Sequence, residues 1–596
     1  MIIADRSELL VRHLMRFLHR CAGDIEPAAT GMIERLIRRT VDGHIAIELR
    51  QENIGGEFDV ATTRDALLAS EIAGTPGDFR PLVLDEHDRL YLYRYWDYER
   101  RVADALSARA AWSDSGHDSQ HLRVLLEKLF DDERVVRQKT AAAIAALRGL
   151  TVVSGGPGTG KTTAVVRMLA LLLELDPTLH IALTAPTGKA AARASDAVRS
   201  AEQRLTLSDA VRERIPDHAA TIHRLLGLRP GYIHFNAQNR LPFDVVVVDE
   251  ASMVGMSLMV TLLDALRPDC RLILLGDKDQ LASVEPGSVL GEICQTAVDY
   301  SPGLAAQLDA LGIAVENTAS QSHALQDNVV RLTHSFRFGA QSGIGRLAEA
   351  IRAGDADEVV SLLRDPAIPE VVLHETDSVQ QQHELLASRL PDNLRDYLEA
   401  VRNRDDPGAI LEKFDCFRLL CAFRQGPTGV RGLNSLAEQV LADNGMIDTS
   451  DNWYAGRPVM ITSNNYTLKL FNGDIGITMR PQDDAEPRVV FGIQDGIRSL
   501  HTPRLPAHTT VFAMTVHKSQ GSEFDKVALV LPDESSELVG RELIYTAVTR
   551  ARQCVEIYGR ANVLRDAIGR LQQRGSGLAD RLRVSPASTP KQRSLF

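Results

Sequence analysis

Aromatic side chains, cysteines and excess positive charge are all scarce in this sequence. Phe, Trp and Tyr make up 5% of 596 residues, and the six cysteines are scattered, with no Cys-x-x-Cys pair. Scattered cysteines predict neither a disulfide framework nor a zinc site, and they fit the reduced thiols of a cytoplasmic protein. The formal net charge of −12 argues against a uniformly basic nucleic-acid binder. Cations lining a cleft stay compatible with that charge, because binding depends on local charge.

Long apolar runs are also missing. No stretch approaches the roughly 18 apolar residues that a membrane-spanning helix needs. The most apolar helical stretch, residues 164–175, is interrupted by Arg167 and Glu174, so we expect no membrane span. The first ten residues include acidic side chains and no cleavable apolar segment, and they therefore predict no secretory signal.

The length of the chain predicts several domains, because one hydrophobic core rarely organises 596 residues. Helical patterns dominate residues 1–110 and predict a separate, mainly helical N-terminal domain that docks partners. Its aromatic-rich stretch, residues 91–98, fits either a buried strand that runs into a helix or a docking surface. Residues 107–120 are polar and rich in small side chains, which is typical of a linker, and we place the linker at residues 111–134.

Two regions alternate short apolar runs with helical stretches, residues 135–330 and residues 331–575. Near-continuous apolar strands separated by helices predict an α/β fold, with a parallel sheet in each region covered on both faces. Polar loops at the carboxyl ends of such strands are where ligands bind. Within the second region, residues 455–510 combine short strands with tight turns and predict a small inserted β-barrel. The Pro- and Ser-rich residues 576–596 predict a flexible tail.

A phosphate-binding loop occupies residues 154–163, where SGGPGTGKTT contains the pattern Gly-x-x-x-x-Gly-Lys-Thr without a mismatch. The glycines of such a loop let backbone N–H groups point inward around phosphates, and the following helix directs its positive end at the anion. We expect Lys161 to reach the β- and γ-phosphates of ATP, and Thr162 to offer its hydroxyl to Mg²⁺. The predicted nucleotide-binding residues of the loop are Gly155, Gly156, Pro157, Gly158, Thr159, Gly160, Lys161, Thr162 and Thr163.

Two further strand ends carry residues suited to hydrolysis. Asp249 follows the apolar run 245–248 and is expected to hold Mg²⁺ through water. Glu250 is placed to polarise an attacking water, which a hydrolase needs and a mere nucleotide binder does not. Gln280, in the loop after the next apolar run, fits either a catalytic sensor of the γ-phosphate and attacking water or an ordinary solvated turn.

The order of these motifs along the chain resembles that of the superfamily 1 helicases, and the resemblance covers about residues 135–560. The later motifs in this order are SFRF at 335–338, MTVHKSQGSEF at 514–524 and YTAVTRAR at 545–552.

Within that superfamily, residues 89–99 and residues 456–477 look like the RecD family, the alpha subunits of exodeoxyribonuclease V. Related helicases that act alone carry a longer N-terminal extension with helix-hairpin-helix elements. About 110 residues precede the core of this chain, which favours the subunit form.

The resemblance implies two RecA-like lobes with ATP between them. Arg337 and Arg550 occupy the two arginine positions of the superfamily and would bring positive charge from the second lobe as the transition state forms. Gly521 and Glu523 resemble residues that approach the ribose and phosphates from that lobe. Gln138 stands where relatives read the adenine edge, although it follows Val-Val-Arg where many relatives have an aromatic residue. An exposed glutamine at a helix start is the alternative.

Candidate contacts with single-stranded DNA come from accessory motifs of the same resemblance, residues 183–193 and residues 220–227. Small hydroxyls, a lysine and backbone N–H groups suit a grip on the phosphate backbone that is independent of base sequence. Taken alone, His223 would also fit a core histidine. The expected DNA-contacting residues are Pro186, Thr187, Lys189, Thr221 and His223 in the first lobe, and Thr515 and His517 in the second.

The resemblance implies an ATP- and Mg²⁺-dependent 5′→3′ DNA helicase. It would be the motor subunit of an exodeoxyribonuclease V complex, with beta and gamma subunits, that processes double-strand DNA ends for recombinational repair. We find no nuclease-like cluster of Asp, Glu and Lys, so cutting would belong to a partner chain. Three alternatives stay open: a free-standing superfamily 1 helicase, a catalytically idle scaffold that binds DNA ends, and a signalling or metabolic P-loop ATPase.

The last five residues, QRSLF at 592–596, resemble the short peptide that docks on bacterial sliding clamps. A frayed terminus with two chance apolar residues is the alternative.

Overall fold

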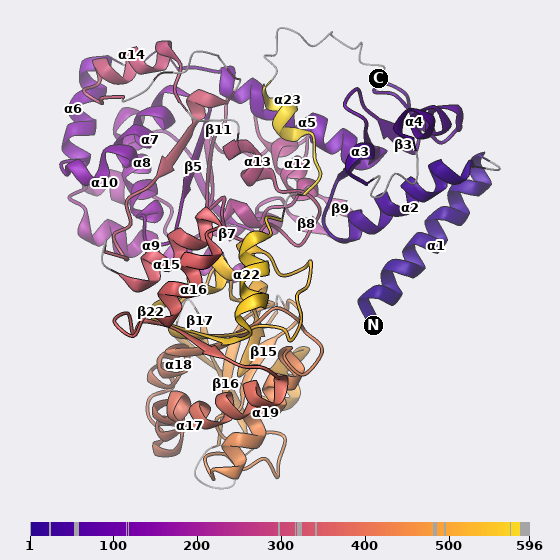
Figure 1. Ribbon diagram of the computed structural model, residues 1–596. Helices are drawn as coiled ribbons and strands as arrows, with labels where there is room; N and C mark the ends of the chain where they lie inside the picture. Colours follow the sequence, from indigo (N-terminus) through magenta and orange to yellow (C-terminus); the bar gives the residue numbers. More distant parts are fainter. Residues whose placement is uncertain are drawn as a thin grey trace.

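The structure is a computed structural model of the chain (Figure 1). It describes residues 2–583 except 23–24, 53–58, 115, 117, 296–298, 316–317, 319–322, 324, 340–341, 466, 481–485, 494–495 and 573. Two parallel sheets form two lobes, and the N-terminal region lies beside the first of them (Figure 1). The six cysteines carry free thiols. Among the described residues, no helix has both the length and the apolar character that crossing a membrane requires.

The N-terminal region combines helices with a small mixed sheet of strand order β1-β4-β3-β2. Both faces of this sheet are covered at β4, because the adjacent residues Leu90 and Tyr91 are both buried, in two different hydrophobic clusters. Its elements are α1 (Ile2–Ala22), α2 (Pro27–Val41), β1 (Ala46–Glu48), α3 (Leu49–Glu52), α4 (Val60–Ala69), β2 (Ala73–Gly74), β3 (Leu82–Leu84) and β4 (Arg89–Leu92). The strand β4 runs directly into α5 (Tyr93–Ala111), so the aromatic stretch contributes to a packed core, as the first of its two interpretations expected.

The first lobe is built on a six-stranded parallel sheet of order β12-β5-β11-β10-β6-β7. Its strands are β5 (Leu150–Gly155), β6 (Ile181–Ala185), β7 (Ala220–Thr221), β10 (Val245–Val248), β11 (Arg271–Gly276) and β12 (Val329–Leu332). The helices around it are α6 (Ser119–Leu129), α7 (Val136–Leu147), α8 (Lys161–Leu175), α9 (Gly188–Arg204), α10 (Asp209–Arg212), α11 (Ile222–Leu225), α12 (Met256–Ala265), α13 (Val289–Gln295) and α14 (Pro302–Ala310).

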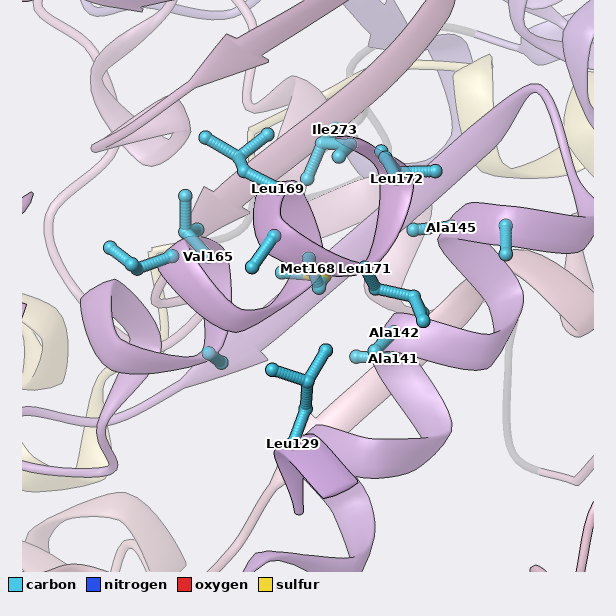
Figure 2. Packing of buried hydrophobic residues seen from close by; sticks show 14 of the residues in the cluster. Leu129, Ala141, Ala142, Ala145, Val165, Met168, Leu169, Leu171, Leu172 and Ile273 are labelled. Carbon is cyan, nitrogen blue, oxygen red and sulfur yellow. The ribbon is translucent and has the colours of Figure 1, made fainter. Parts of the chain in front are cut away.

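Both faces of this sheet are buried by helices. Successive side chains of a strand point to opposite faces, so each strand contributes to both cores. In β10, Val245 and Val247 pack with α7 and α8, whereas Val246 and Val248 pack with α5 and α12. Figure 2 shows the first of these cores, in which the helix after the phosphate-binding loop presents Val165, Leu169 and Leu172 to its neighbours. This packing fixes the helix whose first turn continues from the phosphate-binding loop.

The second lobe repeats the design with a five-stranded parallel sheet of order β13-β22-β21-β14-β20. Its strands are β13 (Val371–Glu375), β14 (Phe417–Cys421), β20 (Ala513–Thr515), β21 (Phe524–Val530) and β22 (Ala551–Gly559). The helices around it are α15 (Gly343–Ala353), α16 (Ala356–Arg364), α17 (Val379–Asn403), α18 (Pro407–Asp415), α19 (Val430–Asp443), α20 (Val516–Ser519), α21 (Arg541–Val548) and α22 (Ala561–Gly569).

The predicted inserted barrel is a five-stranded antiparallel sheet of order β18-β17-β16-β15-β19. Its strands are β15 (Pro458–Ile461), β16 (Ile475–Met479), β17 (Arg488–Ile493), β18 (Gly496–His501) and β19 (His508–Thr510). Within the described part of the chain, β18 and β19 pair with one neighbour each and not with one another. The insertion is confirmed as antiparallel β-structure, and its closure into a barrel is not.

Three of the predicted domain boundaries need correction. Residues 111–134 are not simply a linker, because Leu122, Leu126 and Leu129 recur at helical spacing and bury α6 in the first-lobe core. The N-terminal region is not separate either, since Val102 and Leu106 of α5 are buried in the other first-lobe core. The division between residues 330 and 331 falls inside β12, which pairs with β5.

The predicted flexible tail also begins with an ordered segment. Residues 576–583 include α23 (Leu578–Arg583), which packs on α5 and α13 beside the first lobe (Figure 1). The fully buried Glu99 carboxylate accepts from Ser576 Oγ (2.9 Å), Gly577 N (2.8 Å) and Arg581 Nε (2.7 Å). A buried carboxylate needs such donors, and the short segment supplies them. The proposed clamp peptide, 592–596, lies outside the described residues.

Candidate nucleotide and nucleic-acid site

The phosphate-binding loop joins the end of β5 to the start of α8. Gly158 and Gly160 adopt φ angles of +75° and +76°, a region that glycine enters without steric cost. A side chain at Gly160 would lie 2.6 Å from Nε2 of Gln138, and one at Gly158 would overlap the side chain of Arg337. The loop therefore needs glycine at both positions, for its conformation and for its close neighbours.

Lys161 lies folded over the loop. Its ammonium donates to the carbonyl oxygens of Gly155 (2.6 Å) and Gly156 (3.1 Å). The first turn of α8 directs unpaired backbone N–H groups toward the same place, which favours an anion there. Thr162 and Thr163 follow in that turn and are partly buried. The geometry matches a cradle for the phosphates of a nucleotide.

Gln138 lies beside this cradle and is buried, with 4% of its surface exposed. Its Nε2 donates to the carbonyl oxygen of Thr159 (3.1 Å), whereas its Oε1 is buried without a hydrogen-bond partner. The exposed helix-start alternative for Gln138 is therefore wrong. A buried amide oxygen without a donor costs about 1–3 kcal/mol, and a ligand N–H would satisfy it.

Asp249 and Glu250 follow β10 and face the loop. Glu250 adopts a left-handed conformation (φ +51°), and its N–H donates to Asp249 Oδ1 (2.8 Å). Burial beside the Glu250 carboxylate raises the pKa of Asp249 to about 6. Two adjacent carboxylates favour a cation between them and the phosphates.

The oxygen donors of the site fit Mg²⁺. Thr162 supplies a hydroxyl and Asp249 a carboxylate, and Mg²⁺ prefers such oxygens. Among the described residues, no group of three or more His, Cys, Asp or Glu side chains is arranged to hold a metal. Mg²⁺ needs few protein ligands when phosphates and water supply the others.

The segment 335–338 brings the second lobe against the loop. Phe336 N donates to the carbonyl oxygen of Gly158 (2.8 Å), and Ser335 Oγ approaches that of Pro157 (3.4 Å). These contacts place Arg337 beside the phosphate cradle. Its guanidinium donates to Glu523 Oε1 (2.7 Å).

Glu523 gathers arginines from both lobes. Besides Arg337, its carboxylate pairs with Arg193 of α9 (3.3 Å) and with Arg552 (3.5 Å). Burial alone would raise the pKa of Glu523, but Arg193 and Arg337 outweigh burial and lower that pKa to about 2. Gly521, also expected here, lies near Ala190 at the start of α9. Arg193 was missed from the sequence, although it ends the quoted motif 183–193.

Arg550 is buried at the interface between the lobes, with 3% of its surface exposed. Its guanidinium donates to the carbonyl oxygens of Ser522 (3.2 Å) and Thr546 (3.2 Å). Burial lowers the pKa of Arg550, and the charges of Glu250 and Glu523 oppose that effect. Arg337 thus lies against the loop at Gly158, and Arg550 lies within electrostatic range of Glu250.

Gln280 is buried, so the solvated-turn alternative is wrong. Its Nε2 donates to Asp277 Oδ2 (3.1 Å), and the same oxygen accepts from Tyr545 OH (3.1 Å) of the second lobe. Burial raises the pKa of the Asp277 carboxyl, and Lys161 opposes the shift most strongly. Tyr545 begins the motif at 545–552, and Asp277 begins the loop that carries Gln280, but neither residue was expected at this site from the sequence.

Three of the predicted DNA-contacting residues share one local role. Thr187, Thr221 and Thr515 are the N-caps of α9, α11 and α20, and each hydroxyl accepts a backbone N–H three residues further on. Thr221 and Thr515 are the last residues of β7 and β20, and Thr187 lies two residues after β6, directly after Pro186. Capped helix starts of this kind present N–H groups that suit phosphates.

The basic candidates have different surroundings. His223 is exposed, so the core-histidine alternative is wrong. His517 is half-buried; burial, with Arg574 and Arg424 nearby, lowers its pKa. Burial lowers the pKa of Lys189 to about 8 although Asp415 of the second lobe opposes the shift. Lys189 thus lies within electrostatic range of Asp415 of the second lobe.

These lobes and their shared site define a superfamily 1 helicase. Residues 138–286 match the AAA domain family, and residues 510–558 match the UvrD-like helicase C-terminal domain family. RecBCD enzyme subunit RecD of Mycobacterium tuberculosis is 40% identical over 581 residues, which cover 96% of this chain and 94% of the relative. The chain belongs to the RecD family.

Two more distant proteins are also similar. The ATP-dependent RecD2 DNA helicase of Deinococcus radiodurans is 28% identical over 505 residues, covering 83% of this chain and 59% of that protein. The crystal structure of Bacteroides Pif1 bound to ssDNA is 17% identical, covers 68% of this chain and 88% of Pif1, and has a TM-score of 0.34.

Proposed function

We propose that this chain is an ATP-dependent 5′→3′ DNA helicase and the motor subunit of a RecBCD-type enzyme that processes double-strand DNA ends. One observation carries the proposal: the phosphate-binding loop of the first lobe is in direct contact with the Arg337 segment of the second. A site completed by two lobes converts hydrolysis into relative movement of those lobes.

Each side chain has a defined part in hydrolysis. Lys161 leaves the loop carbonyls for the β- and γ-phosphates, and Arg337 exchanges Glu523 for phosphate oxygens. Arg550 adds positive charge where negative charge develops in the transition state. Glu250 accepts a proton from the attacking water while Gln280 orients that water. Bound Mg²⁺, held by Thr162 and Asp249, would neutralise phosphate charge.

Nucleotide recognition and strand movement follow from the same arrangement. The free Oε1 of Gln138 would accept a hydrogen bond from the adenine amino group. ATP draws the lobes together, and hydrolysis lets them part. The threonine-capped turns of the two lobes then hold the DNA backbone alternately. The 5′→3′ polarity is carried over from the family resemblance.

Family membership favours the subunit form over the alternatives. This chain is 40% identical to a RecBCD enzyme subunit and 28% identical to the RecD2 helicase. We infer partners equivalent to the beta and gamma subunits of exodeoxyribonuclease V. The idle-scaffold alternative is disfavoured because Glu250, Gln280, Arg337 and Arg550, the residues that the proposed hydrolysis needs, are all present. The clamp contact through residues 592–596 stays a prediction.

Strand displacement on forked DNA tests the proposal. Wild type, assembled with its partner subunits, is expected to unwind forks with a 5′ tail and not those with a 3′ tail. Lys161→Gln removes the ammonium and is expected to unwind neither. Unwinding by Lys161→Gln at the wild-type rate would remove the phosphate-binding loop from the mechanism. Gel filtration with and without the partner subunits separates the subunit from the free-standing form.

A further inference from the structure

The loop that carries Gln280 is held from the second lobe at three points. Tyr545 OH donates to Asp277 Oδ2 (3.1 Å) at the beginning of the loop. At its end, Leu281 N donates to Thr546 Oγ1 (2.9 Å), and Gln520 Nε2 donates to the carbonyl oxygen of Leu281 (2.8 Å). Gln280 lies between these points, so its two flanks are fixed by residues of the other lobe.

All partners in these bonds are buried. Leu281, Tyr545 and Thr546 each have 5% or less of their surface exposed, and Gln520 has 6%. While the lobes are closed, water cannot replace a bond that breaks here, so a broken bond leaves a buried polar group unpaired. The three contacts consequently favour one position of the loop, and that position depends on the closed arrangement of the lobes.

Gln520 is also tied to the candidate DNA contacts of the second lobe. It ends the short turn that starts at Thr515, and Gln520 N approaches the carbonyl oxygen of His517 (3.4 Å). Within the turn, Thr515 Oγ1 accepts from Lys518 N (3.4 Å), and Ser519 Oγ donates to the carbonyl oxygen of Val516 (2.8 Å). These bonds link Gln520 to the turn, so a shift of the turn carries Gln520 with it.

We propose that Gln520 is a positioning residue that couples DNA on the second lobe to ATP hydrolysis, by holding Leu281 and so fixing where Gln280 stands. The proposal rests on the proposed function, in which Gln280 orients the attacking water and Thr515 and His517 touch DNA. Gln520 itself touches neither ligand. DNA on the turn favours the closed arrangement, and that arrangement places Gln280 for hydrolysis. Without DNA, the contact with Leu281 is made less often and turnover is slow.

Gln520→Glu provides the sharpest test, because it keeps the shape of the side chain and replaces the donor to Leu281 with an acceptor. The matched control is Gln382→Glu. Gln382 is a buried glutamine of the same lobe whose Nε2 donates to the carbonyl oxygens of Leu531 (3.1 Å) and Tyr558 (2.9 Å). Both changes disturb a buried bond to a carbonyl, but the bonds of Gln382 stay within the second lobe.

The first measurement is ATP turnover by the assembled enzyme, with and without a saturating dT oligonucleotide of about 16 nucleotides. In Gln520→Glu the stimulation by DNA is expected to fall at least about fivefold, the lower end of usual coupling factors. In Gln382→Glu it is expected to stay at the wild-type value. Tyr545→Phe, which removes one hydroxyl from the same loop contact, is expected to lower the stimulation too, and it serves if Gln520→Glu does not fold.

The second measurement is DNA affinity with and without a non-hydrolysable ATP analogue. Coupling is reciprocal, so the change in DNA affinity that the analogue causes should shrink in Gln520→Glu. Each separate affinity should change little, which a general loss of structure would not produce. DNA stimulation in both Gln520→Glu and Tyr545→Phe equal to that of Gln382→Glu would overturn the inference and leave the helicase proposal standing. Wild-type enzyme without any DNA stimulation would overturn both.

Discussion

The two lobes carry the same short turn at the same place in their sheets, in different surroundings. Thr221-Ile222-His223-Arg224 begins at the last residue of β7, and Thr515-Val516-His517-Lys518 begins at the last residue of β20. Each strand is an edge strand of its parallel sheet. In both turns the threonine hydroxyl caps the helix, at 3.2 Å and 3.4 Å, and the next residue is fully buried.

The two turns differ in the surroundings of the histidine and of the basic residue that follows it. His223 and Arg224 are exposed, whereas His517 is half-buried and Lys518 Nζ donates to Asn472 Oδ1 (2.8 Å) of the inserted sheet. The same local sequence thus makes the same capped turn, because a β-branched residue anchors it and a threonine caps it. Packing by neighbouring elements then decides which side chain is free to meet a ligand.

The largest effect is expected from Arg550, because neither turn moves DNA unless both lobes complete the ATP site. Arg550→Ala should lower ATP turnover in the presence of DNA by about 10³-fold, the lower end for an arginine that stabilises phosphoryl transfer. Arg560→Ala is the control, since Arg560 pairs with Asp533 (3.0 Å) outside the site. Near wild-type turnover by Arg550→Ala would confine catalysis to the first lobe.

The threonine caps allow the two turns to be compared directly. Thr221→Ala and Thr515→Ala should each cost about 1 kcal/mol of local stability and weaken binding of labelled single-stranded DNA. The larger loss is expected at Thr515, which is buried where Thr221 is half-buried. Fluorescence anisotropy at one fixed salt concentration measures it. The serine variants keep the hydroxyl and should bind as wild type; serine variants as weak as the alanine variants would show that the caps are not what holds the turns.

The smallest effect concerns pH and distinguishes the histidines. Burial, with Arg574 and Arg424 nearby, lowers the pKa of His517, so the unfolded chain binds a proton more readily than the folded protein. Stability should therefore fall as pH drops below the ordinary histidine pKa of about 6.5, by less than about 1.4 kcal/mol per pH unit.

Thermal unfolding between about pH 7 and 5 measures this dependence on the acid side. His517→Asn should make the fall shallower than in wild type. His223→Asn is the control, because His223 is exposed and its replacement removes no buried ring. An identical slope in His517→Asn and wild type would show that the His517 ring takes up its proton freely in the folded protein.

Contiguous motifs made the nucleotide site largely predictable. The phosphate-binding loop, Asp249–Glu250 and the Arg337 motif each follow a strand end, and the Arg550 motif joins the end of α21 to the start of β22. The chemistry of each motif depends on neighbours in the sequence. Gln138 was harder, since the sequence left open an exposed position, and burial beside Thr159 decided the matter. Helix α6 was missed because the polar residues before it, 111–118, indicated a linker and its own amphipathic pattern is short.

Contacts between the lobes could not be read from the chain. Arg193 and Glu523 are 330 residues apart in sequence and form an ion pair (3.3 Å). Leu281 meets Gln520 and Thr546 across a similar separation. Nothing local to any of these residues specifies its partner.

The sequence by itself determined the two parallel sheets, the glycine-rich cradle and the capped turns. Apolar runs between helical stretches, glycine conformation and threonine capping each act over a short part of the chain. The tertiary structure alone decided which arginines meet at Glu523, which histidine is buried and how the second lobe holds the Gln280 loop. Those outcomes depend on burial and on distances between side chains, which arise only when the two lobes pack together.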